Sequence, residues 1–461
     1  MLNNDRQPII ALASAAGVGG IGVIRISGSN VQIDALCGLL FPGQVFQPRY
    51  AHLLSVRDGE GNVIDRAIVL RFVGPHSYTG EGVLEIQAHG GSAVLQLIMD
   101  RVLEVGKPLE LRHANPGEFT FRSFMHGRID LAQAEAVSDL ISASTGSAAR
   151  AAARSLQGVF SQRAQGICHQ ILELRAYIEA TLDFPEEEID FVRDGHVNEK
   201  IKSIGVQIDE LTCSAMRGKV LRDGLKVILV GSPNVGKSSI MNALVGEDVA
   251  IVTDIAGTTR DRISYTLNLD GLTVNLVDTA GLRETTDTVE RIGIERTLES
   301  VRDADVILHL TSLNQDDATA DEQALEMVRQ NIREGVTYLR VINKIDLSKG
   351  DLQKQPEALY VSAKTGEGIE QIVHKLKQTA GFGEGAQGEF LARTRHLDCL
   401  ARAREHIAVV ESVGVGVGLG MGLEIAAEEL RLAARALSDI GGETVDEDIL
   451  GLIFSKFCIG K

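Results

Sequence analysis

A segment near the middle of the chain has the composition and spacing of a phosphate-binding loop. Gly231-Ser-Pro-Asn-Val-Gly-Lys-Ser238 follows an apolar run and precedes a helical pattern. Glycines let main-chain N–H groups turn toward an anion, the next helix N-terminus adds partial positive charge, and Lys237 adds a full charge. Ser238 offers a hydroxyl to Mg²⁺. The motif predicts nucleotide binding, although taken alone it could be a chance match.

Further motifs follow in the order that a guanine-nucleotide site requires. Asp278-Thr-Ala-Gly281 offers an aspartate to Mg²⁺ through water and a glycine N–H to the γ-phosphate. Asn343-Lys-Ile-Asp346 offers a carboxylate that can accept two N–H bonds from guanine, and Ser362-Ala-Lys364 would complete the base pocket. Alone, the first could be a strand-to-loop turn and the second an Asx turn. Together, at the ends of successive strands, they predict GTP binding.

These motifs require a parallel sheet wrapped by helices. Residues 217–382 alternate apolar strands with helical segments, which is typical of a Ras-like α/β P-loop G domain. Asp270-Gly271 predicts a hairpin turn and hence one antiparallel edge strand. The predicted strands and helix start are Lys226–Val230, Ser238 onward, Thr273–Val277, Val306–Leu310 and Leu339–Ile342.

The segments on either side of residues 217–382 have different residue patterns. Residues 1–122 carry short apolar runs between Gly, Asp and Pro clusters, which predicts an α+β domain. Residues 123–216 and 383–461 have helical spacing. The apolar faces of these two blocks need partners, so we expect a multidomain fold in which the G domain is inserted into one helical domain.

Composition limits the class of protein. The chain has 461 residues, 46 basic against 63 acidic side chains and a formal net charge of −17, which argues against a large RNA footprint on this chain alone. The five cysteines are far apart and lack Cys-x-x-Cys spacing, so a reducing compartment fits best. No stretch approaches the length of a membrane span, and the expected location is the cytoplasm.

The nucleotide block resembles the translation-factor-like branch of Ras-type GTPases, most clearly in Gly257-Thr-Thr-Arg260. The resemblance implies that this segment is the first switch, with Thr259 reaching Mg²⁺ and the γ-phosphate. Leu282 stands where Ras-like proteins place the glutamine that orients the attacking water. Leucine has no group for that task, so a carboxylate or amide from elsewhere must position the water.

The whole chain resembles the MnmE (TrmE) family of GTPases that modify the wobble uridine of tRNA. The resemblance rests on Arg25-Ile-Ser-Gly28, Pro116-Gly-Glu-Phe119, Asp130-Leu-Ala-Gln-Ala-Glu-Ala136 and Phe457-Cys-Ile-Gly-Lys461. It implies that residues 1–122 form a tetrahydrofolate-binding and dimerisation domain. Residues 123–216 and 383–461 would be the two parts of the helical domain.

The family resemblance also implies a cation-assisted mechanism. Asn234, Thr253, Ile255 and Thr258 would surround K⁺, which would take the place of an arginine finger between two G domains. Glu290 would activate the water, although the residue pattern alone fits a first-turn helix glutamate. Arg260 and Arg283 could shape the switches, although exposed arginines beside a nucleotide are often merely solvated. The residues expected to take part in catalysis are Glu290, Lys237, Arg260 and Cys458.

The expected GTP-binding set gathers the loop, switch and base motifs. Ser238 and Thr259 are its Mg²⁺ ligands. The set comprises Asn234, Val235, Gly236, Lys237, Ser238, Ser239, Thr253, Asp254, Ile255, Ala256, Gly257, Thr258, Thr259, Asp278, Thr279, Ala280, Gly281, Asn343, Lys344, Asp346, Ser362, Ala363 and Lys364.

A second site is implied by the resemblance alone. Arg25, Glu85, Arg128 and Lys461 would bind 5-formyl- or methylene-tetrahydrofolate. From the residues alone, Arg25 and Glu85 read as solvent-facing strand positions. Arg128 stands where the family pattern suggests lysine, which keeps the charge and alters the donor geometry. Cys458 would take part in modification, and an exposed thiol in a mobile tail is the plainer interpretation.

The family function is modification at C5 of the wobble uridine with an aminomethyl or carboxymethylaminomethyl group. The expected assembly is a homodimer that forms a heterotetramer with the FAD-containing MnmG partner, which would supply most of the tRNA affinity. Two alternatives share the nucleotide motifs. One is a ribosome-assembly GTPase, and the other is a structural switch that modifies nothing.

Overall fold

The computed structural model describes residues 7–15, 17–183, 196–232, 234–246, 264–269, 271–278, 301–313, 326, 330–333, 335–348, 355–381, 390–413, 420–443, 445 and 447–460. Contacts divide the chain into two compact units. The first unit comprises Met1–Ser138, Ser155–Gly205 and Arg402–Lys461, and the second comprises Asp139–Arg154 and Val206–Ala401. The predicted domain limits, after residues 122, 216 and 382, stay predictions.

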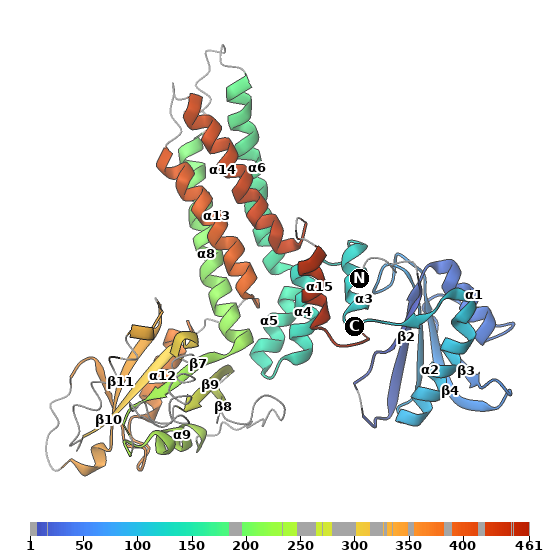
Figure 1. Ribbon diagram of the computed structural model, residues 1–461, viewed down its shortest axis with the longest axis horizontal. Helices are drawn as coiled ribbons and strands as arrows, with labels where there is room; N and C mark the ends of the chain where they lie inside the picture. The colour runs from blue at the N-terminus through green and yellow to red at the C-terminus, as the bar shows by residue number, and fades with distance from the viewer. Residues whose placement is uncertain are drawn as a thin grey trace, which may run out of the picture. The chain divides into compact units, whose positions relative to one another are not determined.

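The first unit contains a six-stranded sheet in the order β3-β4-β5-β2-β1-β6. Its described neighbours pair antiparallel, except β1 and β6, which are parallel. The strands are β1 (Ile9–Leu12), β2 (Ile21–Gly28), β3 (His52–Arg57), β4 (Val63–Phe72), β5 (Gly82–His89) and β6 (Arg112–His113). Helices α1 (Asn30–Leu40) and α2 (Ser92–Gly106) cover one face (Figure 1), which confirms the α+β prediction.

The side chains of β2 point alternately to the two faces of the first sheet. Ile24 and Ile26 are fully buried in the core under α1 and α2. Arg25 lies between them and therefore points to the opposite face, since successive strand side chains alternate. Ile9 and Ala11 pack on that opposite face against Phe119 of α3 (Glu118–Met125). The second face thus carries a small apolar cluster beside a charged side chain.

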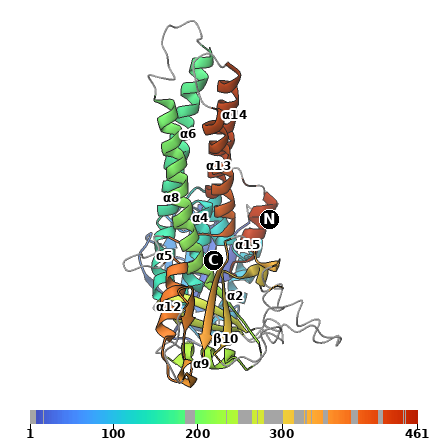
Figure 2. The same ribbon diagram turned by 90° about the vertical axis from the view of Figure 1, so that its left-hand side faces the viewer.

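Long helices follow the first sheet and return at the end of the chain. Helix α6 (Val159–Asp183) packs along α14 (Gly420–Gly441), as Figure 2 shows. The predicted apolar stripes are buried at Ile167, Ile171, Leu174 and Ile178, and at Leu423, Ala426, Ala427, Leu430, Ala434 and Leu437. The other helices here are α4 (Leu131–Ser142), α5 (Gly146–Leu156), α8 (Val197–Asp223), α13 (Thr394–Val413) and α15 (Glu447–Ser455). None of the described helices is long and apolar enough to cross a bilayer.

The second unit contains a six-stranded sheet in the order β12-β11-β10-β7-β9-β8. All described pairs are parallel except β8 with β9, and β8 is the edge strand, as the Asp270-Gly271 turn predicts. The strands are β7 (Leu225–Val230), β8 (Ser264–Leu269), β9 (Leu272–Asp278), β10 (Val306–Ser312), β11 (Thr337–Asn343) and β12 (Ala358–Tyr360). Helices α9 (Lys237–Gly246) and α12 (Ile369–Thr379) pack on its core. The predicted α/β fold is confirmed.

Candidate nucleotide-binding site

The phosphate loop joins the end of β7 to the start of α9. Asn234 and Gly236 have φ values of 63° and 100°, so the loop turns through left-handed conformations. A side chain at Gly231 would place its Cβ 2.3 Å from the carbonyl oxygen of Leu310, which leaves room only for glycine. Lys237 donates from Nζ to the carbonyl oxygens of Gly231 and Ser232, at 2.8 and 3.2 Å. The phosphate loop therefore wraps around the ammonium group of Lys237.

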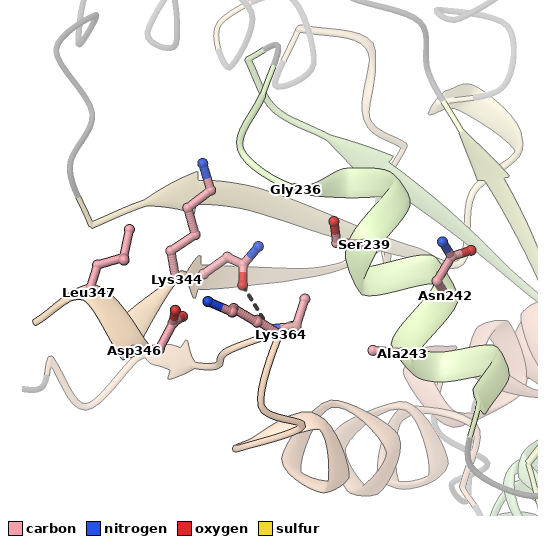
Figure 3. Close-up of a pocket in the computed structure, with 10 residues that line it drawn as sticks. Gly236, Ser239, Asn242, Ala243, Lys344, Asp346, Leu347 and Lys364 are labelled. Carbon is pink, nitrogen blue, oxygen red and sulfur yellow. Dashed lines mark hydrogen bonds between the residues drawn. The ribbon is translucent and has the colours of Figure 1, made fainter.

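A pocket of about 700 Å³ opens beside this loop, between α9 and the ends of β11 and β12. This volume lies within the usual range for small-molecule sites. Figure 3 shows that the lining residues come from α9 on one side and from the segments after β11 and β12 on the other. Its lining residues are Gly236, Ser239, Asn242, Ala243, Asn343, Lys344, Asp346, Leu347, Ala363 and Lys364.

Asn343 is a buried residue of the pocket lining, with 1% of its surface exposed. Its Nδ2 donates to the carbonyl oxygen of Val235 at 2.9 Å, and its Oδ1 accepts from the main-chain N–H of Ala363 at 3.1 Å. Figure 3 marks the second bond. One amide side chain thus ties the phosphate loop, the end of β11 and the loop after β12 together.

Asp346 is exposed in the pocket and is oriented by Ser362. The hydroxyl of Ser362, which is fully buried, donates to Asp346 Oδ1 at 2.7 Å and accepts from the main-chain N–H of Thr365 at 3.2 Å. The carboxylate still faces the pocket (Figure 3), where it can accept N–H bonds. Guanine presents two neighbouring N–H donors on one edge, and a carboxylate matches both.

Lys344 links the base side of the pocket to the phosphate loop. It has φ 64°, and its Nζ donates to the carbonyl oxygen of Asn234 at 2.7 Å. The bond holds Asn234 in its left-handed conformation, which asparagine tolerates better than most residues. Sequence spacing gave no signal for this contact, because the two residues are 110 positions apart.

Other parts of the predicted site lie only partly within the described residues. Ser238 and Ser239 are exposed on the first turn of α9. The last residue of β9, Asp278, is in register with Leu229 near the end of β7, which puts this strand end beside the phosphate loop. Outside the described residues lie Thr253, Asp254, Ile255, Ala256, Gly257, Thr258, Thr259, Arg260, Thr279, Ala280, Gly281, Leu282, Arg283, Glu290 and Lys461.

Models of known protein families match most of this chain. Residues 8–128 match a family model described as the GTP-binding protein TrmE N-terminus, and residues 131–458 match the MnmE helical domain. The chain belongs to the MnmE (TrmE) family. A tRNA modification GTPase MnmE of Ralstonia nicotianae is 48% identical and covers 98% of this chain and 96% of its own. The MnmE of Burkholderia cenocepacia is 47% identical with full coverage of both chains, and that of Bordetella parapertussis is 48% identical over 98% and 99%.

Two of the residues predicted to bind folate, Arg25 and Glu85, lie on the face of the first sheet that is opposite α1 and α2. Arg25 and Glu85 are directly opposite in the β2–β5 pairing, and Arg25 Nε donates to Glu85 Oε1 at 2.8 Å. Their side chains are 21% and 15% exposed, so they are half-buried and not the freely solvated positions that strand alternation alone suggests. The Arg25 guanidinium lies 5.4 Å from the ring centre of Tyr78 and 6.0 Å from that of Phe119. A charged pair beside aromatic rings fits a flat, hydrogen-bonding heterocycle.

Arg128 lies elsewhere on the same unit. It is exposed after the end of α3, and its side chain lies close to Gly80. A Cβ at Gly80 would meet the Arg128 Cγ at 3.4 Å. No described contact joins Arg128 to the Arg25–Glu85 pair, so its place in one folate site stays a proposal.

The C-terminal tail packs against the same unit. Phe457 is buried in a cluster with Phe121 and Phe454, and the carbonyl oxygen of Cys458 accepts from the main-chain N–H of Gly117 at 3.3 Å. A Cβ at Gly460 would lie 2.1 Å from the carbonyl oxygen of Leu12 on β1. The Cys458 thiol is exposed, yet Phe457 before it and Gly460 two residues after it are packed against the first unit.

Sequence analysis missed a buried charge network in this unit. Arg122 bridges Glu81 and Glu118, at 3.0 and 2.9 Å, and Arg112 bonds Glu118 at 2.6 Å. Ser27 Oγ also donates to Glu81, at 2.8 Å. Pro116-Gly-Glu-Phe119 was a signal for the family, but it did not show that its glutamate is 3% exposed between two arginines. The network fixes α3 to the strand ends below it.

Proposed function

We propose that this chain binds and hydrolyses Mg²⁺–GTP in the pocket of Figure 3 as one part of a tRNA-modifying assembly. As a member of the MnmE family it is a GTP hydrolase. Two hydrogen bonds beside the phosphate loop carry the nucleotide assignment, that from Asn343 to Val235 and that from Ser362 to Asp346. The tRNA assignment is supported by 47–48% identity, over nearly the full length, to relatives named tRNA modification GTPases.

The residues divide the work of GTP binding. Asp346 accepts the N–H bonds of guanine, and Asn343 holds the loops around the base. The Nζ of Lys237 exchanges its bonds to the loop carbonyls for bonds to the phosphates. Ser238 and Thr259 would hold Mg²⁺, with Asp278 on the same side of the phosphates. Ser239 and the loop amides bind the remaining phosphate oxygens.

Hydrolysis requires a way to neutralise charge and to place the water. Leu282 has no group for the second task, and Glu290 takes it as general base. Asn234, with Thr253, Ile255 and Thr258, would hold K⁺ when two G domains meet, and the cation would supply the charge stabilisation that an arginine finger gives elsewhere. Arg260 shapes the first switch. Because this K⁺ site would form only when two G domains meet, the rate of GTP hydrolysis depends on dimerisation.

The first unit supplies the second substrate. Arg25, Glu85, Arg128 and Lys461 hold a 5-formyl- or methylene-tetrahydrofolate, which provides a one-carbon unit when bound. The docked tail brings Cys458 to the same unit, where it serves the modification. An FAD-containing MnmG partner joins the homodimer and binds most of the tRNA, since this chain carries a net charge of −17. The assembly works in the cytoplasm and modifies C5 of the wobble uridine.

Nucleoside analysis of tRNA tests this function against the two alternatives. In a strain lacking the gene, we expect the modified wobble uridine to be lost and to return with the wild-type gene. The Asp346→Asn variant should restore less than the wild type, because its nucleotide pocket no longer matches guanine. Unchanged tRNA together with a ribosomal-subunit defect would favour the ribosome-assembly class. Unchanged tRNA with normal subunits would favour a switch that modifies nothing.

A further inference from the structure

The hairpin of β8 and β9 connects the two predicted switch segments. The segment that contains Thr259 precedes Ser264, where β8 begins, and β9 ends at Asp278, the first residue of the second nucleotide motif. The strands pair from Leu269 with Leu272 to Ser264 with Val277, one residue before the end of β9. A paired hairpin transmits displacement along its axis better than a single strand. Its turn lies about 23 Å from Asp278 at the usual rise per strand residue.

The turn of this hairpin is tethered to α5. Ser147 Oγ donates a hydrogen bond to the main-chain carbonyl oxygen of Gly271. Thr145 Oγ1 lies 3.0 Å from Ser147 Oγ and also accepts from the N–H of Ala148, at 3.2 Å. With the Ser147 proton directed to Gly271, Thr145 is the donor to Ser147, so the hydroxyls form a chain. Gly271 N–H is in turn bonded to Asn268 Oδ1 at 2.7 Å.

A second tether joins the middle of the hairpin to the end of α8. Asn275 on β9 donates from Nδ2 to the carbonyl oxygen of Asp223 at 2.9 Å and accepts at Oδ1 from Thr266 on β8 at 3.1 Å. Gly224 has φ 78°, and a Cβ there would lie 2.6 Å from Asn275 Nδ2. The amide therefore spans both strands and holds them to the chain that leads into the sheet.

The hydrogen bonds of Ser147 and Asn275 connect the hairpin to α5 and α8, which pack against each other. Ala151 and Ala152 of α5 form a buried cluster with Leu221 of α8 and with Leu391. Asp139 at the end of α4 is 7% exposed and binds both Arg222 Nε, at 2.9 Å, and Arg393 Nη2, at 2.7 Å. The cluster and the charges fix α4, α5 and the end of α8 to one another. All of these residues belong to the second compact unit.

We propose that Ser147 and Asn275 are positioning residues for GTP hydrolysis, acting through the β8–β9 hairpin on the position of Asp278. The proposal rests on the GTPase activity proposed above. Anchoring at the turn and at Asn275 sets how far β9 reaches toward the phosphate loop. Coupling between two sites is reciprocal, so the nucleotide that is bound also changes the stability of the hydrogen bonds at the start of α5.

Kinetics of full-length variants test this role. Ser147→Ala and the isosteric Asn275→Asp should lower kcat for GTP about three- to tenfold, as expected for a coupling of one hydrogen bond. Their GDP affinity should stay within about twofold of the wild type, because the base pocket and phosphate loop are untouched. Ser147→Thr keeps the hydroxyl and should restore most of the rate. Ser412→Ala is the matched control, since Ser412 also bonds a main-chain carbonyl, that of Val409, on an exposed helical turn.

Hydrogen exchange gives a second readout that general destabilisation would not mimic. In the wild type, the amides of Ala148 and Ala149 should exchange at different rates with GDP and with a non-hydrolysable GTP analogue. The Ser147→Ala variant should lose that difference. Unchanged kcat in both Ser147→Ala and Asn275→Asp, or a parallel fall of kcat and GDP affinity, would overturn the positioning role. A wild-type protein without GTPase activity would instead overturn the proposed function.

Discussion

The side-chain amide of Asn343 donates a 2.9 Å hydrogen bond to the main-chain carbonyl oxygen of Val235, 108 residues earlier in the chain. The same side chain accepts from Ala363 N–H, so both ends of one buried amide are used. The phosphate loop and the base pocket therefore hold each other in place. Loss of either partner leaves a buried polar group unsatisfied, which costs about 1–3 kcal/mol.

Replacing Asn343 should separate these two roles. We expect Asn343→Ala to lower GDP affinity at least about tenfold, because it leaves the carbonyl of Val235 and the N–H of Ala363 without partners. Asn343→Asp keeps the acceptor for Ala363 but replaces the donor with a buried carboxylate oxygen that faces the carbonyl of Val235, so it should bind GDP no better than alanine. Titration with a fluorescent GDP measures both. Equal affinity of all three proteins would show that Asn343 does not organise the site.

The cation dependence of hydrolysis tests the role of Asn234. GTPase rates of the wild type should be higher in KCl than in NaCl, because the smaller ion fits the same oxygen cage less well. Asn234 has φ 63°, so Asn234→Ala changes both the side chain and the backbone preference. Asn234→Gly is the matched variant, since it removes the amide and tolerates that φ. If the glycine variant kept the K⁺ preference, the Asn234 side chain would not be a ligand.

The Arg25–Glu85 pair tests the folate proposal. Arg25→Met should reduce binding of 5-formyl-tetrahydrofolate about tenfold, through loss of a charged donor and of its stacking on Tyr78. GDP binding should not change. Arg66→Met, at an exposed position on β4, is the control for loss of one positive charge. Equilibrium dialysis with the folate is the measurement, and equal binding by both variants would remove Arg25 from the site.

The buried Glu118 predicts a pH dependence for the first unit. Burial opposes its ionisation, but bonds from Arg112, Asn115 N–H and Arg122 outweigh that effect and hold the pKa of Glu118 below its usual value. A carboxyl whose pKa is lower in the folded state stabilises the fold above the unfolded value of about 4.3. That stability is lost as the pH falls through the folded-state pKa.

Exchange of the β1 amides measures this contribution. Glu118→Gln should lower their protection by about 2 kcal/mol near neutral pH, since two arginines lose a buried partner. The difference from the wild type should begin to shrink below the unfolded value and should vanish as the pH falls through the lowered folded-state pKa of Glu118, where the wild-type carboxyl is also neutral. Glu104→Gln, which breaks the exposed pair with Arg101, should have little effect at any pH. A difference that did not change with pH would contradict the assignment.

The sequence predicted the elements well and the contacts between them poorly. Alternation placed Arg25 and Glu85 on strands, but their pairing depends on the register of β2 and β5, which are separated by the β3–β4 hairpin. The spacing of Asn343 and Asp346 marked a base pocket, yet it did not show that Asn343 holds Val235. Ser147 gave no signal, because its role depends on a main-chain carbonyl more than a hundred residues away. Local patterns set the periodicity of an element, whereas hydrogen-bond partners depend on tertiary packing.

Base specificity tests the central claim, that the Asp346 pocket reads guanine and fuels the family function. Asp346→Asn should lower GDP affinity about tenfold to a hundredfold and raise affinity for xanthosine diphosphate, whose base carries a carbonyl where guanine has an amino group. Glu367→Gln, at an exposed carboxylate in the neighbouring loop, should leave both affinities unchanged. Competition titration of the two nucleotides against fluorescent GDP is the measurement. A reversed preference in Asp346→Asn is the result we predict, and an unchanged preference for GDP would contradict the account.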